Sequence, residues 1–454
     1  MMTTLTRLAS CVALCCAFSI PAFAAVTEEQ AARLGSSLTP MGAEKAGNAN
    51  GTIPVWEGGL SKNAGNIQNG FRENPYASEK PLFTIDAQNY TQYQDKLSPG
   101  QIAMFKRYSA TYKMPVYTTH RSAGVPDEVA QDIRKNAVST TLVEGGNGIE
   151  NFRTAIPFPI PQNGLEAIWN HIARYRGKAF LRQASQAVPQ VSGVYVQVDV
   201  SERFALADQV TDYDPQSSNN LLYYYNSLIT APARLAGNVL LVHETLNQVT
   251  EPRLAWLYNS GQRRVRRAPQ VAYDGPGTAS DGMRTADGLE HFNGSPDRYE
   301  WQLVGKREMY IPYNSYRAGS PKIKIKDLIM PGHLNPEFTR YELHRVWEVV
   351  ATLKPGQRHI YAKRHLYIDE DTWAISLADH YDNRDALWRV GESHLQYFYD
   401  AQISHPTPEA LYDLVAGRYI VSGMINESSK PYDFTFKASN KDFLPATLRT
   451  MGIR

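Results

Sequence analysis

The segment from Arg358 to Asp382, RHIYAKRHLYIDEDTWAISLADHYD, concentrates the residue types that bind metals or move protons. It holds three histidines and five acidic residues. Imidazole and carboxylate groups are common zinc ligands and general acids or bases, provided that they meet at one point. Whether they meet depends on the secondary structure of the segment.

The alternation of apolar and polar residues in this segment predicts a β-hairpin whose solvated tip is the turn at Glu370 and Asp371. The histidines then share the polar face of the hairpin. At the usual rise per residue, His359 and His365 lie roughly 20 Å apart, and His380 lies about 13 Å from His365. One metal ion needs ligand atoms within about 2 Å of it. We therefore predict neither a metal site nor a catalytic site on this face.

The other face of the predicted hairpin is apolar but carries two charges. In the expected register Arg364 faces Leu377, and Arg364 and Asp379 project from this face as diagonal neighbours. A charged pair on an apolar face costs desolvation free energy. Two interpretations stand: an ordinary buried ion pair at a sheet end, or a polar anchor inside a ligand cavity. The apolar candidates for a cavity wall are Trp347, Leu366, Ile368, Trp373 and Ile375.

Four arginines lie close together in the segment WLYNSGQRRVRRAPQ. On a strand they alternate between the two faces around Val265. Such a strand serves as a patch for an anion, a lipid head group or a protein partner, or as a solvated sheet edge that its charges protect from aggregation. The four residues are Arg263, Arg264, Arg266 and Arg267.

Sequence motifs of common enzymes are absent from the chain. It has no G-x-S-x-G elbow, HExxH helix, phosphate-binding loop or dinucleotide fingerprint. The acidic residues of the loop at 281–297 lack the spacing of a calcium loop. We therefore expect a protein that is not an enzyme and has no cofactor. A hydrolase that uses the histidine face is the weakest of the alternatives.

Two regions of different pattern must position these residues. Residues 25–189 combine short helical patterns with irregular chain, whereas residues 190–454 hold long runs of period-two alternation separated by turn residues. Strands and helices do not alternate in sequence, which argues against a parallel sheet. We predict an α+β fold: a large, curved antiparallel sheet, with helices from the N-terminal region packed on it or lidding it.

The N-terminus has the pattern of a cleaved export signal, which we predict to be residues 1–24 with cleavage after Ala24. All 3 cysteines lie in this signal, so the mature chain has no disulfide or thiolate. With 47 basic and 45 acidic residues, the charge gives no reason to expect binding to nucleic acid. We expect a protein of the Gram-negative periplasm that associates peripherally with the outer membrane.

Several longer motifs resemble those of a known family. They are LTPMGAEKAGNANGTIPVWEGGL, WLYNSGQRRVRRAP, GMRTADGLEHFNGSPDRYEWQLVGKREMYIPYN and RHLYIDEDTWAISLADHYD. The family comprises proteobacterial envelope proteins that carry a domain of unknown function, often labelled outer-membrane lipoprotein-sorting-like. The resemblance runs over essentially the whole mature chain. It implies a fold similar to the lipoprotein carriers LolA and LolB, in which an incomplete antiparallel barrel wraps a hydrophobic cavity lidded by helices.

The resemblance also implies a function. It favours a periplasmic carrier or chaperone for a lipid or other hydrophobic ligand, with an RND-type exporter and an outer-membrane β-barrel protein as expected partners and with transient membrane contact. LolA-like carriers hold their lid with an arginine on the cavity side of a strand, and Arg364 is the candidate for such a role by its face. The alternative is a non-catalytic accessory subunit that docks on an envelope transport complex through its sheet and Arg263 to Arg267.

Overall fold

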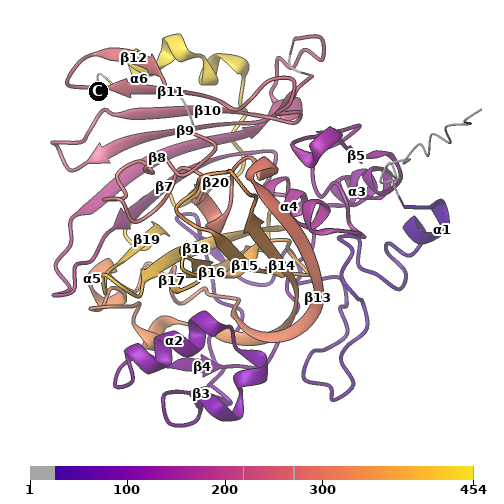
Figure 1. Cartoon of the computed structure of the whole chain (residues 1–454), viewed down its shortest axis with the longest axis vertical. Helices are drawn as coiled ribbons and strands as arrows, with labels where there is room; N and C mark the ends of the chain where they lie inside the picture. The colour runs from indigo at the N-terminus through magenta and orange to yellow at the C-terminus, as the bar shows by residue number, and fades with distance from the viewer. Residues whose placement is uncertain (1–25, 218, 269–270, 453–454) are drawn as a thin grey trace, which may run out of the picture.

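The computed structural model describes residues 26–217, 219–268 and 271–452. The predicted signal peptide, residues 1–24, and its cleavage site lie outside the described residues. One sheet of 16 strands dominates the fold (Figure 1). Within the described ranges, no helix has both the length and the apolar content that crossing a membrane requires.

The sheet runs from an arginine-rich edge strand to two short strands of the N-terminal region. The main path, in spatial order, is β12 (Arg264–Arg267), β11 (Leu254–Asn259), β10 (Val239–Thr245), β9 (Leu221–Ala231), β8 (Gln197–Leu206), β7 (Ala179–Ala187), β19 (Tyr419–Met424), β18 (Ile403–Asp413), β17 (Leu387–Phe398), β16 (Ile375–Tyr381), β15 (Lys363–Asp369), β14 (Tyr341–Leu353), β4 (Met114–Val116) and β3 (Phe83–Ile85). Two further strands branch from this path: β13 (Tyr299–Pro312) pairs with β14, and β20 (Tyr432–Asp433) pairs with β7. All pairs are antiparallel except β14 with β4.

The helices are few and short. They are α1 (Glu28–Ala31), α2 (Pro99–Arg107), α3 (Asp127–Ser139), α4 (Gly164–Ile172), α5 (Ile325–Leu328) and α6 (Leu448–Gly452). Two separate ribbons complete the secondary structure: β1 (Ile67–Gln68) with β2 (Phe71–Arg72), and β5 (Thr141–Leu142) with β6 (Ile149–Glu150). The predicted fold class is confirmed: a large, unclosed, mainly antiparallel sheet with helices of the N-terminal region packed on it. Because β7, β4 and β3 precede residue 190, both predicted regions contribute to this one sheet.

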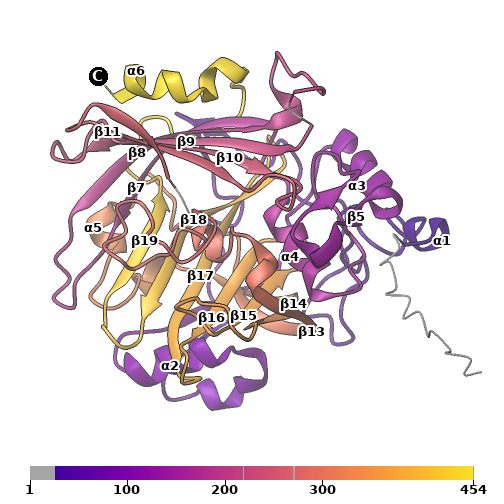
Figure 2. The ribbon, with the colours of Figure 1, turned by 45° about the horizontal axis from the view of Figure 1, so that its top comes forward.

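The sheet bends so that its two halves face each other across α4 and the segment that follows β12 (Figure 2). One buried core joins both halves: Phe180 and Phe204 of β7 and β8 share it with Leu366 of β15 and with Trp169 of α4. Helix α4 is capped by Asn163, whose side chain accepts a hydrogen bond from the backbone N–H of Glu166 at 3.0 Å. We call the face that carries this core the inner face.

The outer face is covered by other parts of the chain. The C-terminal residues around α6 lie over β8–β11, where Phe443 stacks on Tyr224 and Leu448 is fully buried. Figure 1 shows α6 above β10 and β11. Helix α2 packs on β16 and β17 with Met104 and Phe105 buried. Both faces of the sheet are therefore largely closed to solvent, unlike those of a simple amphipathic sheet.

The register of the hairpin β15–β16 differs from the predicted one. Arg364 pairs with His380, and His365 pairs with Asp379, whereas the expected partner of Arg364 was Leu377. The connection spans residues 370–374, and the register shifts again beside Ile368. An odd total slip moves every side chain of one strand to the other face. The prediction that Arg364 and Asp379 share a face was therefore wrong.

Candidate functional site

A cavity of about 200 Å³ lies on the inner face of β7–β10. The segment 271–298, which precedes β13, lines it from the opposite side, and we call it the covering segment. Strands β18 and β19 complete the wall with His405, Glu409 and Ser422. The apolar part of the wall consists of alternate residues that point inward from the strands: Phe180, Val200, Phe204, Leu240 and Val242.

Most charges around the cavity are neutralised by ion pairs within the wall. Arg182 and Glu202 pair across β7 and β8, and the hydroxyl of Tyr225 donates to the same carboxylate. Burial, followed by the charge of Glu202, raises the pKa of Tyr225 well above its usual range. Arg253 forms a similar pair with Glu244. A hydrophobic ligand meets these groups as satisfied pairs, which lowers the cost of covering them.

Buried ion pairs tie the covering segment to the rest of the fold. Glu290 of the segment accepts from Arg176 at 2.6 Å and from Arg174 at 2.7 Å. Although burial opposes ionisation, the two guanidinium groups lower the pKa of Glu290 well below its usual range. The cover of the cavity is thus held by charges that sit next to the cavity itself.

Arg364 provides the second attachment. Its Nη2 atom lies 2.6 Å from Oδ2 of Asp287 in the covering segment and 3.0 Å from Nε2 of His359. The guanidinium is fully buried between the rings of Phe292, Tyr299 and Tyr361, each about 5 Å away. Against the effect of burial, Arg364 and His359 hold the pKa of Asp287 far below its usual value. The acid that Arg364 binds is Asp287.

Asp379 lies on the outer face and serves a different helix. Its carboxylate accepts from the backbone N–H of Gly100 at 3.0 Å and from the hydroxyl of Ser98 at 3.2 Å, at the N-terminus of α2. Burial outweighs these two hydrogen bonds and raises the pKa of Asp379 to about 7. A Cβ atom at Gly100 would lie 2.0 Å from Oδ1 of Asp379, so this contact requires glycine.

The five apolar candidates lie in or against the packed core beside α4. Leu366, Ile368 and Ile375 are at most 1% exposed and belong to the same core as Trp169. Trp347 stacks on Trp373, with ring centroids 6.2 Å apart. The structure brings these residues together, but they do not line the cavity on β7–β10.

The four arginines lie at the free edge of the sheet. Arg264, Arg266 and Arg267 are exposed on β12, and Arg263 is exposed in the turn before it. Among the described residues, none of the four takes part in an ion pair with another side chain. Their position is compatible with both interpretations of this strand.

The three histidines of the hairpin lie in separate settings. His359 contacts Asp287 and Arg364, and His365 lies 3.4 Å from Glu348. His380 shares the inner face with Arg364 and stacks on Tyr361. The prediction that the histidines share one face was wrong, because the slip in register places His365 and His380 on opposite faces. Burial lowers the pKa of His380 well below its usual range, so this side chain is neutral.

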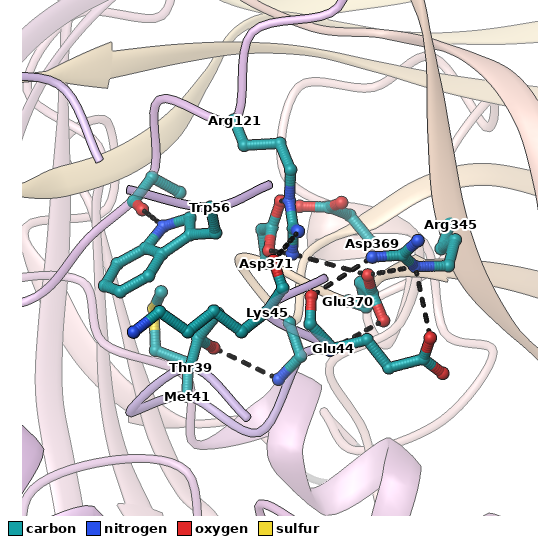
Figure 3. A network of polar contacts seen from close by, with 12 residues as sticks. Thr39, Met41, Glu44, Lys45, Trp56, Arg121, Arg345, Asp369, Glu370 and Asp371 are labelled. Atoms are coloured by element: carbon teal, nitrogen blue, oxygen red, sulfur yellow. Dashed lines mark hydrogen bonds and ion pairs between the residues drawn. The ribbon is translucent and has the colours of Figure 1, made fainter. Parts of the chain in front are cut away.

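The turn at Glu370 and Asp371 is buried and is not a solvated tip (Figure 3). Arg121 donates to both carboxylate oxygens of Asp371, at 2.9 and 2.6 Å. Arg345 donates to Glu370 at 2.7 Å and to the backbone carbonyl oxygen of Glu44 at 3.1 Å. The turn therefore anchors the N-terminal segment to the sheet. Local sequence could not reveal this, because Arg121 lies 250 residues from Asp371 and Glu44 lies 326 residues from Glu370 along the chain.

A cluster of one histidine and two aspartates near this turn has the composition of a metal site. Ligand atoms of His344, Asp369 and Asp371 lie within 4.8 Å of one another, and all three residues are buried. Burial, and then the neighbouring charge of Asp371, raises the pKa of Asp369 to about 7. Since Arg121 already binds both oxygens of Asp371, we assign the group to the ionic network of Figure 3.

Comparison with known proteins identifies the family of the chain. Residues 84–449 match the family described as "protein of unknown function (DUF1329)". The chain belongs to this family. An uncharacterized protein of Pseudomonas aeruginosa is 62% identical over 432 residues, which cover 95% of each chain. The family membership expected from the sequence motifs is thus confirmed.

Solved structures similar to this DUF1329 chain are distant. A DUF1329 family protein from Desulfovibrio piger has 14% identity and a TM-score of 0.40, covering 60% of this chain and 92% of that one. A putative outer membrane lipoprotein-sorting protein domain from Vibrio parahaemolyticus has 13% identity and a TM-score of 0.44, covering 63% and 98%. A LolA superfamily protein from Nitrosomonas europaea has 11% identity and a TM-score of 0.34, covering 60% and 92%. Likenesses of this size leave the function of the chain open.

Several residues of the cavity escaped the sequence reasoning. Tyr223 and Val242 lie in the region of period-two alternation, but alternation alone does not say which apolar face stays unfilled. Phe180 lies on β7, before residue 190 and therefore outside the region in which strands were expected. Glu409 sits in the strand ISHPTPEALYD, directly between Pro408 and Ala410. A carboxylate beside apolar residues within a strand was a local signal that could have marked this position.

Proposed function

We propose that this protein is a non-catalytic carrier or chaperone that binds a lipid or another hydrophobic ligand in the cavity on β7–β10. The observation that carries the proposal is the covered cavity itself: its strand side is lined by aromatic and aliphatic residues such as Phe180, Phe204 and Val242. Burying apolar surface there contributes about 25 cal/mol per Å². Binding in such a site needs only a few polar groups for orientation.

Most of the charged residues in the cavity wall are paired, which supports a carrier over an enzyme. The ion pairs Arg182–Glu202 and Arg253–Glu244 hold their partners inside the wall. Paired groups of this kind shape and close a cavity, whereas a catalytic acid or base must be free to reach a substrate. We extend the proposal to the periplasm as the place of action. An RND-type exporter and an outer-membrane β-barrel protein are the proposed partners, with transient membrane contact.

Ligand binding tests the proposal directly. Protein purified from its own periplasm is expected to release a lipid or another hydrophobic molecule, detected by native mass spectrometry. The emptied protein is expected to enhance the fluorescence of N-phenylnaphthylamine. Val242→Trp, which fills the cavity, should abolish this signal. Val249→Trp is the matched control, since Val249 is 62% exposed outside the cavity. A protein without bound ligand and without any probe response would refute the carrier function.

The exposed edge strand supports a second candidate function. Arg264, Arg266 and Arg267 present unpaired positive charge on β12, where a transporter or barrel protein could add a strand. A non-catalytic accessory subunit would dock there. Replacing the three arginines with glutamate should then abolish co-purification with a membrane partner, while Val242→Trp leaves it intact. The opposite pattern would favour the carrier.

A further inference from the structure

Two charged residues of the cavity wall differ from all the others. Arg176, Arg182, Glu202, Arg253 and Glu290 each form an ion pair with another side chain. Among the charged residues that the structure describes around the cavity, only two form no ion pair, and they are Glu409 and Arg284. Unpaired charge is costly next to an apolar wall, so its presence there requires an explanation.

The geometry of Glu409 makes it available to a ligand. It is only 6% exposed, lines the cavity from β18 and makes no side-chain hydrogen bond to the described residues. Its cross-strand neighbour is Ser422 of β19, whose hydroxyl accepts from Arg284 at 3.3 Å. Arg284 of the covering segment therefore lies beside Glu409 but does not form an ion pair with it.

Charged side chains from several elements surround Glu409, so this corner of the cavity is polar. The charges that act on it come from three elements: Arg284 and Glu290 of the covering segment, Arg174 after α4, and Arg182 of β7. Burial is the strongest influence and raises the pKa of Glu409 to about 7. Arg174, Arg182 and Glu290 are already engaged elsewhere, which leaves Arg284 as the one cation free to act with Glu409.

The size of the cavity limits what reaches this corner. The cavity has a volume of about 200 Å³. That is below the roughly 300 Å³ at which drug-sized ligand pockets begin. A single acyl chain or part of one fits this space better than a lipid with two chains.

We propose that Glu409 and Arg284 form a head-group site, and that the ligand is a single-chain amphiphile with an uncharged, hydroxylated polar end. The carboxylate of Glu409 accepts a hydrogen bond from a hydroxyl group, and the guanidinium of Arg284 donates one to an oxygen atom. Because the two charges cancel, a neutral head group is preferred to an anionic or a cationic one. This inference rests on the proposed carrier function and names its ligand class.

Three amphiphiles with the same lauryl-length chain test the inference. Monolauroylglycerol, laurate and laurylamine would each compete with N-phenylnaphthylamine for the full-length mature protein at pH 8. We expect monolauroylglycerol to compete roughly tenfold better than either charged amphiphile, since one hydrogen bond to a charged group changes affinity by about that factor. Glu409→Ala leaves Arg284 alone and should shift the preference toward laurate. Arg284→Ala leaves Glu409 alone and should shift it toward laurylamine.

The controls separate this inference from the carrier function. Both variants should fold, because neither side chain forms an ion pair with any part of the chain that the structure describes, and thermal melting checks this. Glu251→Ala and Arg263→Ala remove charges that are exposed away from the cavity and should keep the wild-type ranking. If the wild type binds all three amphiphiles equally, or if both cavity variants keep its ranking, the head-group site is refuted while the carrier stands. If the wild type binds neither the probe nor any amphiphile, the carrier function fails.

Discussion

The two halves of the sheet carry the same alternation of residues but use their inner faces differently. On β14–β16 the inner face packs against α4, and Leu366 and Ile368 are fully buried. On β7–β10 part of the inner face joins the same core, but between these strands, the covering segment and β18–β19 a cavity of about 200 Å³ remains. An apolar strand face is therefore necessary for a binding wall but does not define one. The element that packs on it decides between core and cavity.

Two arginines show the same contrast in their charges. Arg364 is fully buried and bound to Asp287, with aromatic rings around it. Arg284 lines the cavity and has no acidic partner within ion-pair distance among the residues that the structure describes, although Glu409 lies close by. The filled half satisfies its charges internally, and the hollow half leaves two of them for a ligand. Four predictions test this contrast, beginning with the largest effect.

The largest loss of stability is expected from Trp373→Ala in the filled half. The change removes the stack on Trp347 and the hydrogen bond from Nε1 to the carbonyl oxygen of Met41 at 2.8 Å. Deleting a fully buried tryptophan costs about 3–5 kcal/mol. Urea unfolding would measure the free energy of unfolding. A cost below about 1 kcal/mol would show that this half is not the packed one.

Arg364→Met is expected to lower the free energy of unfolding by about 3 kcal/mol, because it leaves the buried carboxylate of Asp287 without its cation. The double variant Arg364→Met/Asp287→Leu should recover much of that loss, because no unpaired charge is left. Hydrogen exchange of residues 271–298 would follow the covering segment. Exchange should be faster in the single variant than in the wild type, and unchanged exchange would mean that Arg364 does not hold this segment.

Asp379 is expected to make stability depend on pH. Its pKa is about 7 in the folded protein against an ordinary 3.8, so the folded state keeps a proton that the unfolded state releases. The resulting stabilisation is complete below pH 3.8 and is lost as the pH rises to 7. In Asp379→Asn this contribution disappears, so the difference in melting temperature from the wild type should change between pH 5 and pH 8. Asp95→Asn, at an exposed site, should show no such change.

The smallest effect on stability is expected from Val242→Ala in the hollow half. Val242 lines the cavity and is only partly buried, so removing its methyl groups should cost about 1 kcal/mol or less. Binding of N-phenylnaphthylamine should change more than stability does. If the loss matched that of Trp373→Ala, the two halves would be packed alike and the distinction between them would fail.

Much of the fold could be predicted from local patterns, and less of the site. The period-two runs identify most strands, and the spacing of Ile168 and Ile172 identifies α4. The register of β15–β16 could not be predicted, because a bulge beside Ile368 adds an irregular step that leaves no mark in the alternation. That single shift places Arg364 and Asp379 on opposite faces of the sheet and so decides their partners.

The sequence by itself determined the class of the protein: its family, its antiparallel sheet and its shortage of enzyme motifs. These properties follow from local periodicity and from motifs, which depend on neighbouring residues. Only the tertiary structure decided which inner face is filled, that Glu370 and Asp371 anchor the N-terminal segment, and that Glu409 and Arg284 line the same cavity. Those outcomes depend on packing between residues far apart along the chain, where the cost of burying a charge depends on partners that no local pattern records.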